Sequence, residues 1–207
     1  MESDTLPRMP PIPLEPMPTA PPVRHKIAFI GTHGVGKTTL CYGLAARLKA
    51  RDHAVEVVHE VARRCPLPIN EETGLESESW ILHTQIAEEI VAQHRYPIVV
   101  CDRSALDNYV YLLLAARRLP QLDALVDAWM ETYDLLVHVP VVDEPSPDGI
   151  RSADPAFQRA VEERLIQELA ARGLDALRLD PGGRAGWLDA VETVVRRRLR
   201  PAQMELL

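Results

Sequence analysis

The chain has 207 residues, of which 46% are hydrophobic, so it is long enough for one globular domain with a sizeable core. Its formal net charge of −7 argues against a nucleic-acid groove, because such a groove needs a basic face. No apolar run approaches the roughly 18 residues of a membrane span, and the three cysteines form no C-x-x-C pair. These features predict a cytoplasmic protein that binds neither membrane nor nucleic acid and holds no zinc.

Residues 1–23 contain a large share of the 18 prolines of the chain and show no periodic apolar pattern. We therefore expect an extended or disordered tail there and a folded domain over residues 24–207. Pro10 and Pro13 have the P-x-x-P spacing of a docking peptide, and a plain leader is the alternative.

A phosphate-binding loop is the strongest signal in the sequence. Residues 27–30 are apolar and predict a buried strand, and a leucine every fourth residue from Leu40 to Leu48 predicts a helix. Residues 31–38 between them fit the G-x-x-x-x-G-K-[ST] loop, whose backbone N–H groups surround the phosphates of a bound ATP. Lys37 can reach the β- and γ-phosphates, and the Thr38 hydroxyl can bind Mg²⁺. The predicted nucleotide-binding residues are Gly31, Thr32, His33, Gly34, Val35, Gly36, Lys37, Thr38 and Thr39.

Four further strands are expected, at residues 54–58, 97–101, 134–139 and 174–179. Helices are expected between them and after the last one, at residues 79–94, from about residue 104, and at 121–132, 155–171 and 187–199. Strands that alternate with helices predict an α/β protein with a doubly wound, five-stranded parallel sheet, that is, a P-loop NTPase fold.

Two local features of these elements can be predicted in more detail. In the helix over residues 79–94, Trp80, Thr84, Ala87 and Val91 form one stripe, and the glutamates of the preceding residues 71–78 are expected on a solvated surface. Ser104 and Asp107 have the spacing of a capping box that opens the next helix.

Ligands of such sheets bind at the carboxyl ends of the strands. Four charged residues follow strands at that edge: Glu60, Asp102, Arg103 and Arg151. Asp102 is predicted to be the Mg²⁺ partner of the phosphate loop, in the Walker-B position. Glu60 is predicted to be the general base that deprotonates an acceptor hydroxyl, and the arginines to neutralise the migrating phosphoryl group.

Each of these residues also has a purely structural interpretation. Asp102 can cap a turn, and Glu60 can form a surface pair with Arg64 four residues on. Arg103 can be a surface ion-pair residue, and Arg151 an ordinary loop residue.

The chain resembles the small P-loop kinases of the nucleoside type, in particular the ribosylnicotinamide kinase domain and related ATP-binding (AAA-type) proteins. The resemblance covers roughly residues 26–179. Besides the phosphate loop, it rests on Glu60-x-Ala62-Arg63, Gln85, Asp102-Arg103-Ser104 and Asp148-Gly149-Ile150-Arg151-Ser152.

The resemblance implies a role for several residues. Glu60 would be the general base and would bind the substrate together with Arg63. Gln85 would recognise the nucleobase of the substrate. Arg151 would be a lid arginine that closes on the phosphates. The turn over residues 180–183 would lie where such kinases hold adenine. Gln85 can also be an ordinary polar helix residue. The acidic residues 71–78 stand where a base-binding signature is expected, so the resemblance does not fix the acceptor.

The leading hypothesis is an ATP- and Mg²⁺-dependent phosphotransferase that acts on a hydroxyl of a small, nucleoside-like substrate. The alternative is a nucleotide-binding regulatory ATPase or switch that acts through a protein partner. A GTPase is disfavoured because neither Asn70 nor Asn108 begins an N-K-x-D motif.

Overall fold

The structure is a computed structural model that describes residues 24–69, 73–143 and 154–199. The predicted proline-rich tail and the expected lid motif at residues 148–152, with Arg151, lie outside the described residues. No helix in the described ranges is both long and apolar enough to span a membrane.

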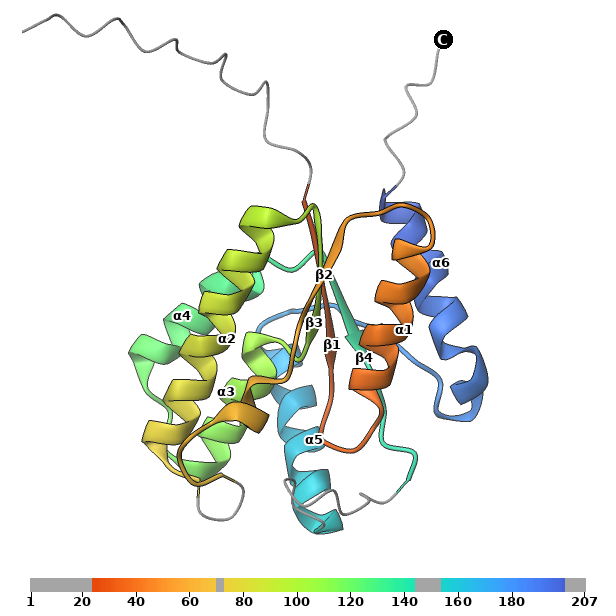
Figure 1. Cartoon of the computed structure of the whole chain (residues 1–207). Helices are drawn as coiled ribbons and strands as arrows, with labels where there is room; N and C mark the ends of the chain where they lie inside the picture. The colour runs from red at the N-terminus through yellow and green to blue at the C-terminus, as the bar shows by residue number, and fades with distance from the viewer. Residues whose placement is uncertain (1–23, 70–72, 144–153, 200–207) are drawn as a thin grey trace, which may run out of the picture.

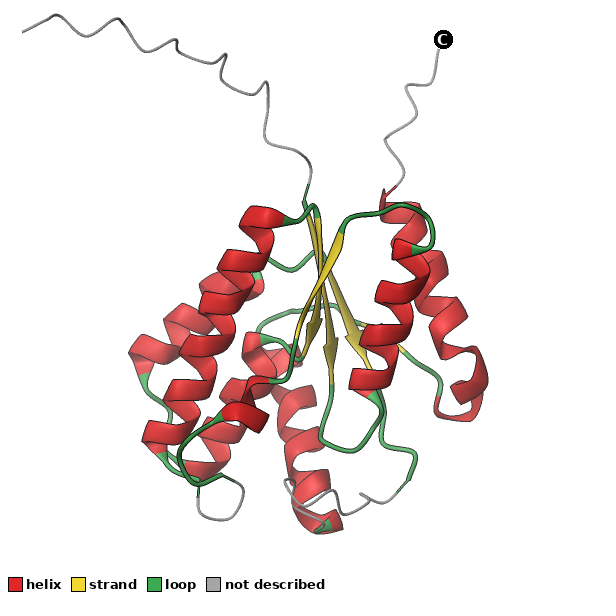
Figure 2. Cartoon of the chain, viewed as in Figure 1, coloured by secondary structure: helices red, strands yellow, loops and turns green. Residues whose placement is uncertain are grey.

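Within these ranges, five strands form one parallel sheet in the order β2-β3-β1-β4-β5, which confirms the predicted fold class. Their carboxyl ends point the same way (Figure 2). The strands are β1 (His25–Ile30), β2 (Val55–Val58), β3 (Ile98–Asp102), β4 (Leu135–His138) and β5 (Leu177–Arg178). The last strand is shorter than the predicted residues 174–179.

Helices cover both faces of the sheet (Figure 1). One face carries α1 (Lys37–Lys49) and α6 (Trp187–Leu199). The other carries α2 (Leu75–Arg95), α3 (Ala105–Ala115), α4 (Pro120–Met130) and α5 (Pro155–Ala171). Short 3-10 helices, η1 (Val61–Arg64) and η3 (Pro181–Gly186), follow β2 and β5.

The central strand β1 shows why both faces need covering. Ala28 and Ile30 belong to the core beneath α2–α5, whereas Ile27 and Phe29 belong to the core beneath α1 and α6. Alternate side chains of a strand point to opposite faces, so an unbroken apolar run buries both. The chain order reverses across β1, which lies between β3 and β4, and such a switch point opens a crevice for ligands.

The α2 helix differs from the prediction. It begins at Leu75 rather than near residue 79, and the predicted inward stripe is wrong: Ala87 and Val91 are exposed. The buried side of the helix instead mixes apolar and polar residues, and includes Ser77, Glu78, Ile81, Leu82, Gln85, Ile86, Glu89 and Ala92.

Candidate active site

The phosphate loop joins β1 to α1 at the carboxyl edge of the sheet, as predicted. Gly34 and Gly36 have φ values of 80° and 97°, a left-handed conformation that glycine adopts without strain. The Lys37 ammonium group folds back over the loop and donates to the carbonyl oxygens of Gly31 (2.7 Å) and Thr32 (2.5 Å). These contacts hold the two ends of the loop together.

Two helices hold the first half of this loop from the side. The Gly31 N–H donates to the Asp107 carboxylate of α3 (2.9 Å), and the Thr32 N–H lies 3.4 Å from the Glu162 carboxylate of α5. Asp107 also accepts from the backbone N–H and hydroxyl of Ser104, so the predicted capping box is present. Because carboxylates hold the N–H groups of the first two loop residues, the later ones are left to face an anion.

Asp102 ends β3 beside the start of α1, and the Thr38 hydroxyl donates to its Oδ2 at 2.5 Å. The aspartate is buried and accepts from a residue of the phosphate loop, as the predicted role beside Mg²⁺ requires. A hydroxyl and a carboxylate side by side at a phosphate loop are hard oxygen donors of the kind that Mg²⁺ accepts together with phosphates and water. No group of three or more His, Cys, Asp or Glu forms a metal cage among the described residues.

Glu60 follows β2 and meets two guanidinium groups. Arg103 Nε donates to its Oε1 (2.8 Å) and Arg63 Nε donates to its Oε2 (2.9 Å). Arg64 instead pairs with Glu88, so the surface pair of Glu60 with Arg64 is not formed. Arg103 is buried rather than a surface ion-pair residue, and its φ of 93° is unusual for a residue with a side chain.

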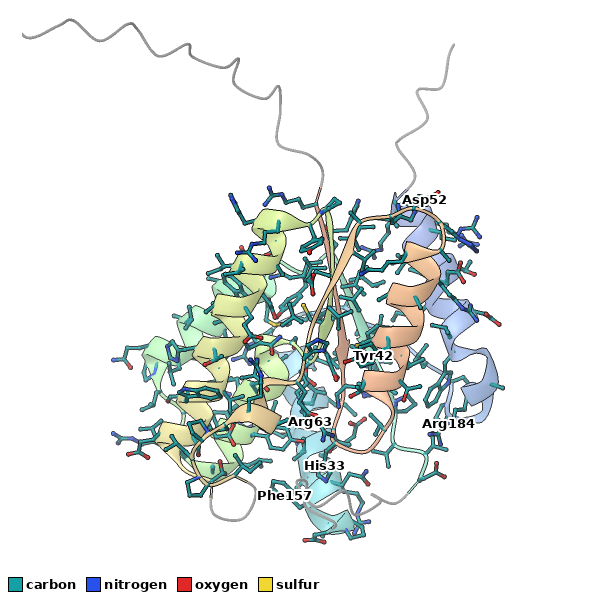
Figure 3. All side chains as sticks on the ribbon, viewed as in Figure 1. His33, Tyr42, Asp52, Arg63, Phe157 and Arg184 are labelled. Carbon is teal, nitrogen blue, oxygen red and sulfur yellow. The ribbon has the colours of Figure 1, made fainter. Side chains whose placement is uncertain are left out.

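Two cavities meet at this cluster. The loop cavity is lined by Gly34, Gly36, Lys37, Thr38, Thr39 and Arg63. The second cavity is lined by His33, Glu60, Ala62, Arg63, Ile69, Glu78, Ile81, Arg103, Asn108 and Tyr111. Arg63 lines both, and Figure 3 places it with His33 at the end of the molecule opposite Asp52. The predicted residues Lys37, Glu60, Asp102 and Arg103 thus converge.

Gln85 does not line the second cavity. Its amide nitrogen donates to the Glu89 carboxylate (2.8 Å) and lies 3.4 Å from the Arg103 carbonyl oxygen. The role of Gln85 as a base reader therefore stays a prediction. Gln85 lies behind Arg103, where it supports the backbone of that residue.

Several residues of the second cavity were missed or misjudged from the sequence. Glu78 was expected on the surface but is buried in the cavity wall. The Arg103 guanidinium lies over the Tyr111 ring, with its Cζ atom 5.0 Å from the ring centre. The Tyr111 hydroxyl lies 3.1 Å from His33 Nδ1. The sequence spacing could have indicated Tyr111: it lies four residues after Asp107 on α3, so the two residues share one side of the helix.

Burial sets the charge state of the loop lysine. The pKa of Lys37 is lowered from 10.5 to about 8: burial is the largest cause and the neighbouring Arg103 guanidinium also lowers it, whereas Asp107, Asp102 and Glu60 act to raise it. Buried groups with shifted pKa values gather at functional sites. An incoming phosphate would supply the negative charge that favours the protonated lysine.

Comparison with known proteins places the chain in a family. A family model described as an AAA domain matches residues 26–185, most of the chain and all of the site described above. The chain belongs to this AAA-domain family. No curated protein matches the chain by sequence.

Solved structures of P-loop kinases resemble this AAA-domain protein in fold. Thymidylate kinase from Ehrlichia chaffeensis has a TM-score of 0.59 at 18% identity, over 86% of this chain and 100% of that one. Deoxyadenosine kinase from M. mycoides, solved with bound dATP, has a TM-score of 0.59 at 14% identity, over 84% and 100%. The NadR protein, solved with NAD and AMP-PNP, has a TM-score of 0.61 at 20% identity, over 88% of this chain and 52% of that one. The expected resemblance to small P-loop kinases is confirmed, and at these identities it concerns the fold.

Proposed function

We propose that this AAA-domain protein is an ATP- and Mg²⁺-dependent kinase that transfers the γ-phosphoryl group to a hydroxyl of a small, nucleoside-like acceptor. One observation carries the proposal: Arg63 lines both the loop cavity and the second cavity, and it is paired with Glu60, which lines the second. A carboxylate suited to a base therefore lies between a phosphate site and a separate, partly apolar acceptor site.

The phosphates of ATP bind to the backbone N–H groups of residues 34–39 and to the Lys37 ammonium group. Thr38 and Asp102 would hold Mg²⁺, which would neutralise phosphate charge. The acceptor oxygen bonds to the γ-phosphorus, and its proton passes to Glu60. The bond from that phosphorus to the oxygen it shares with the β-phosphate breaks, and ADP leaves.

Arg63 links nucleotide binding to the basicity of Glu60. Its side chain is 37% exposed and lines the loop cavity, so it can turn from Glu60 toward a γ-phosphate. Glu60 would then retain the buried Arg103 and lose one neighbouring positive charge, which makes its carboxylate a stronger base. By resemblance we assign the lid role to Arg151, which would approach the same phosphates.

The experiment is a coupled assay of ADP release from Mg²⁺–ATP, over a panel of nucleosides, nicotinamide riboside and short oligonucleotides. We expect one class of small acceptor to stimulate ADP release strongly and oligonucleotides to have no effect. Slow hydrolysis that no acceptor stimulates would contradict the kinase and support the regulatory ATPase.

All three cysteines are free, and we keep the cytoplasm as the proposed location on that basis.

A further inference from the structure

Glu78 presents a buried carboxylate to the second cavity. It is 4% exposed and lies in the first turn of α2. Within the described ranges, its side chain accepts one hydrogen bond, from the Thr73 hydroxyl to Oε1 (2.6 Å), and it forms no ion pair. Burial raises the pKa of Glu78. A carboxylate in such a place is stabilised by a ligand that brings a hydrogen-bond donor or a positive charge.

Two donors of the same cavity are also incompletely bonded. Arg103 Nη1 and Asn108 Nδ2 are buried and have no hydrogen-bond partner among the described residues. Buried N–H groups are almost always bonded, so both call for acceptor atoms on a ligand. The cavity therefore offers donors on one set of residues and an acceptor on another.

The positive charges of the cavity are already engaged. Arg103 and Arg63 both donate to Glu60, and Arg103 also lies over the Tyr111 ring. The lining thus has two guanidinium groups and two carboxylates, and Glu78 interacts with the Arg103 guanidinium without forming a salt bridge to it. A phosphate dianion bound here would add two negative charges to a lining whose two guanidinium charges are already balanced by Glu60 and Glu78.

We propose that the second cavity takes an unphosphorylated, neutral or positively charged nucleoside-like alcohol, and that Glu78 selects it by accepting a hydrogen bond from it. This inference rests on the proposed kinase function. Hydroxyl, amino and amide groups supply both the donor that Glu78 accepts and the acceptors that Arg103 and Asn108 lack. The first product would then be a monophosphate, which the same cavity binds poorly.

The first test uses the unaltered protein. Initial rates of ADP release are measured with adenosine, thymidine and nicotinamide riboside, and with the 5′-monophosphate of each. We expect kcat/KM to be higher for every active nucleoside than for its monophosphate. A preference for the monophosphates would overturn the inference and leave the kinase intact. No stimulation by either set would overturn the proposed kinase, and this inference with it.

The second test is Glu78→Gln, with Glu76→Gln as the matched control, since Glu76 lies in the same turn of α2 and is exposed. Loss of one charged hydrogen bond should raise KM for the best acceptor about ten- to hundredfold. The kcat value should change far less, and the KM for ATP should stay the same. Glu76→Gln should match the parent. An unchanged acceptor KM in a folded Glu78→Gln protein would overturn the role of Glu78.

Discussion

The Glu60 carboxylate is held by guanidinium groups from two elements that are far apart in the sequence, η1 and the end of β3. Arginine partners favour the ionised form of a carboxylate and make it a weak base. For proton transfer, one partner must leave, and Arg63 is the more exposed of the two. At the scale of single residues, the proposed chemistry therefore depends on an exchange of partners around Glu60.

Glu60→Gln tests this role. The amide keeps the shape and can still accept a hydrogen bond from Arg103, but it cannot take a proton, so kcat should fall by roughly 10²–10⁴. ATP affinity, measured by calorimetry with a non-hydrolysable analogue, should change little. Glu56→Gln is the control, because Glu56 is in β2 but lines a different cavity. Unchanged turnover in Glu60→Gln would remove this residue from the mechanism.

The lowered pKa of Lys37, about 8, makes nucleotide affinity depend on pH. Above that value the free protein loses the charge that attracts phosphate, so affinity should fall by at most about tenfold per pH unit. Calorimetric titration with an ATP analogue between pH 7 and 10 measures this change in affinity. Lys37→Arg should bind more weakly but with a flat profile, because arginine stays charged. A flat profile for the parent protein would contradict the assignment.

The same shift has a consequence for stability. Since the folded-state pKa of Lys37 lies below its unfolded value of 10.5, the unfolded chain binds more protons between about pH 8 and 10.5. The Lys37 contribution to the free energy of unfolding should therefore rise with pH across that window. In Lys37→Met this contribution should disappear.

At the scale of elements, the junction between β1 and the phosphate loop is under the tightest steric constraint. Gly31 has a φ of 139°, and a Cβ built there would lie 2.6 Å from the Val139 carbonyl oxygen after β4. Alanine can fit only if the loop or the end of β4 shifts. The close approach of these two backbones explains why glycine is needed at the first position of the loop.

Gly31→Ala should lower the free energy of unfolding by about 1–3 kcal/mol, the cost of one strained backbone position. It should also abolish the rise in Tm that an ATP analogue and Mg²⁺ produce, because the loop is displaced. Gly186→Ala is the control, since nothing lies within 4 Å of a Cβ at that position. A normal ligand-induced rise in Tm in Gly31→Ala would contradict the steric argument.

The buried side of the α2 helix could not be predicted from the sequence. The first four strands, the loop and the α3 capping box were predicted correctly because each depends on a local pattern of apolar, glycine or capping residues, whereas β5 is shorter than predicted. On α2, the polar residues Glu78, Gln85 and Glu89 occupy the buried side, so apolar spacing selected the wrong stripe. Nor could the sequence pair Glu60 with Arg103, which lies 43 residues away and reaches it only through the register of β2 and β3.

At the scale of the whole molecule, a buried ionic network joins the sheet to its helical layer. Lys26 of β1 and Glu89 of α2 are fully buried and 2.9 Å apart. Glu89 also accepts hydrogen bonds from Trp129, Tyr133 and Gln85. The network therefore connects β1, α2 and α4 and, through Gln85, reaches the backbone of Arg103.

Lys26→Met should lower the free energy of unfolding by about 3–5 kcal/mol, because it leaves Glu89 charged and buried without its cation. Lys26→Met combined with Glu89→Gln should lose less than Lys26→Met alone, since the amide still accepts hydrogen bonds and carries no charge. Urea unfolding of Lys26→Met, Glu89→Gln, the double variant and the parent measures this difference. Simple additivity of the two substitutions would show that the residues do not act as a pair.

The central claim is that a phosphoryl group passes from ATP in the loop cavity to a second molecule in the neighbouring cavity, with Arg63 in the wall of both. Its most direct test is a mass balance after the reaction with the best acceptor is quenched. ADP, inorganic phosphate and phosphorylated acceptor are separated and quantified from the same sample. The claim predicts one phosphorylated acceptor for each ADP and almost no inorganic phosphate. Equal amounts of ADP and inorganic phosphate, with the acceptor unchanged, would contradict it.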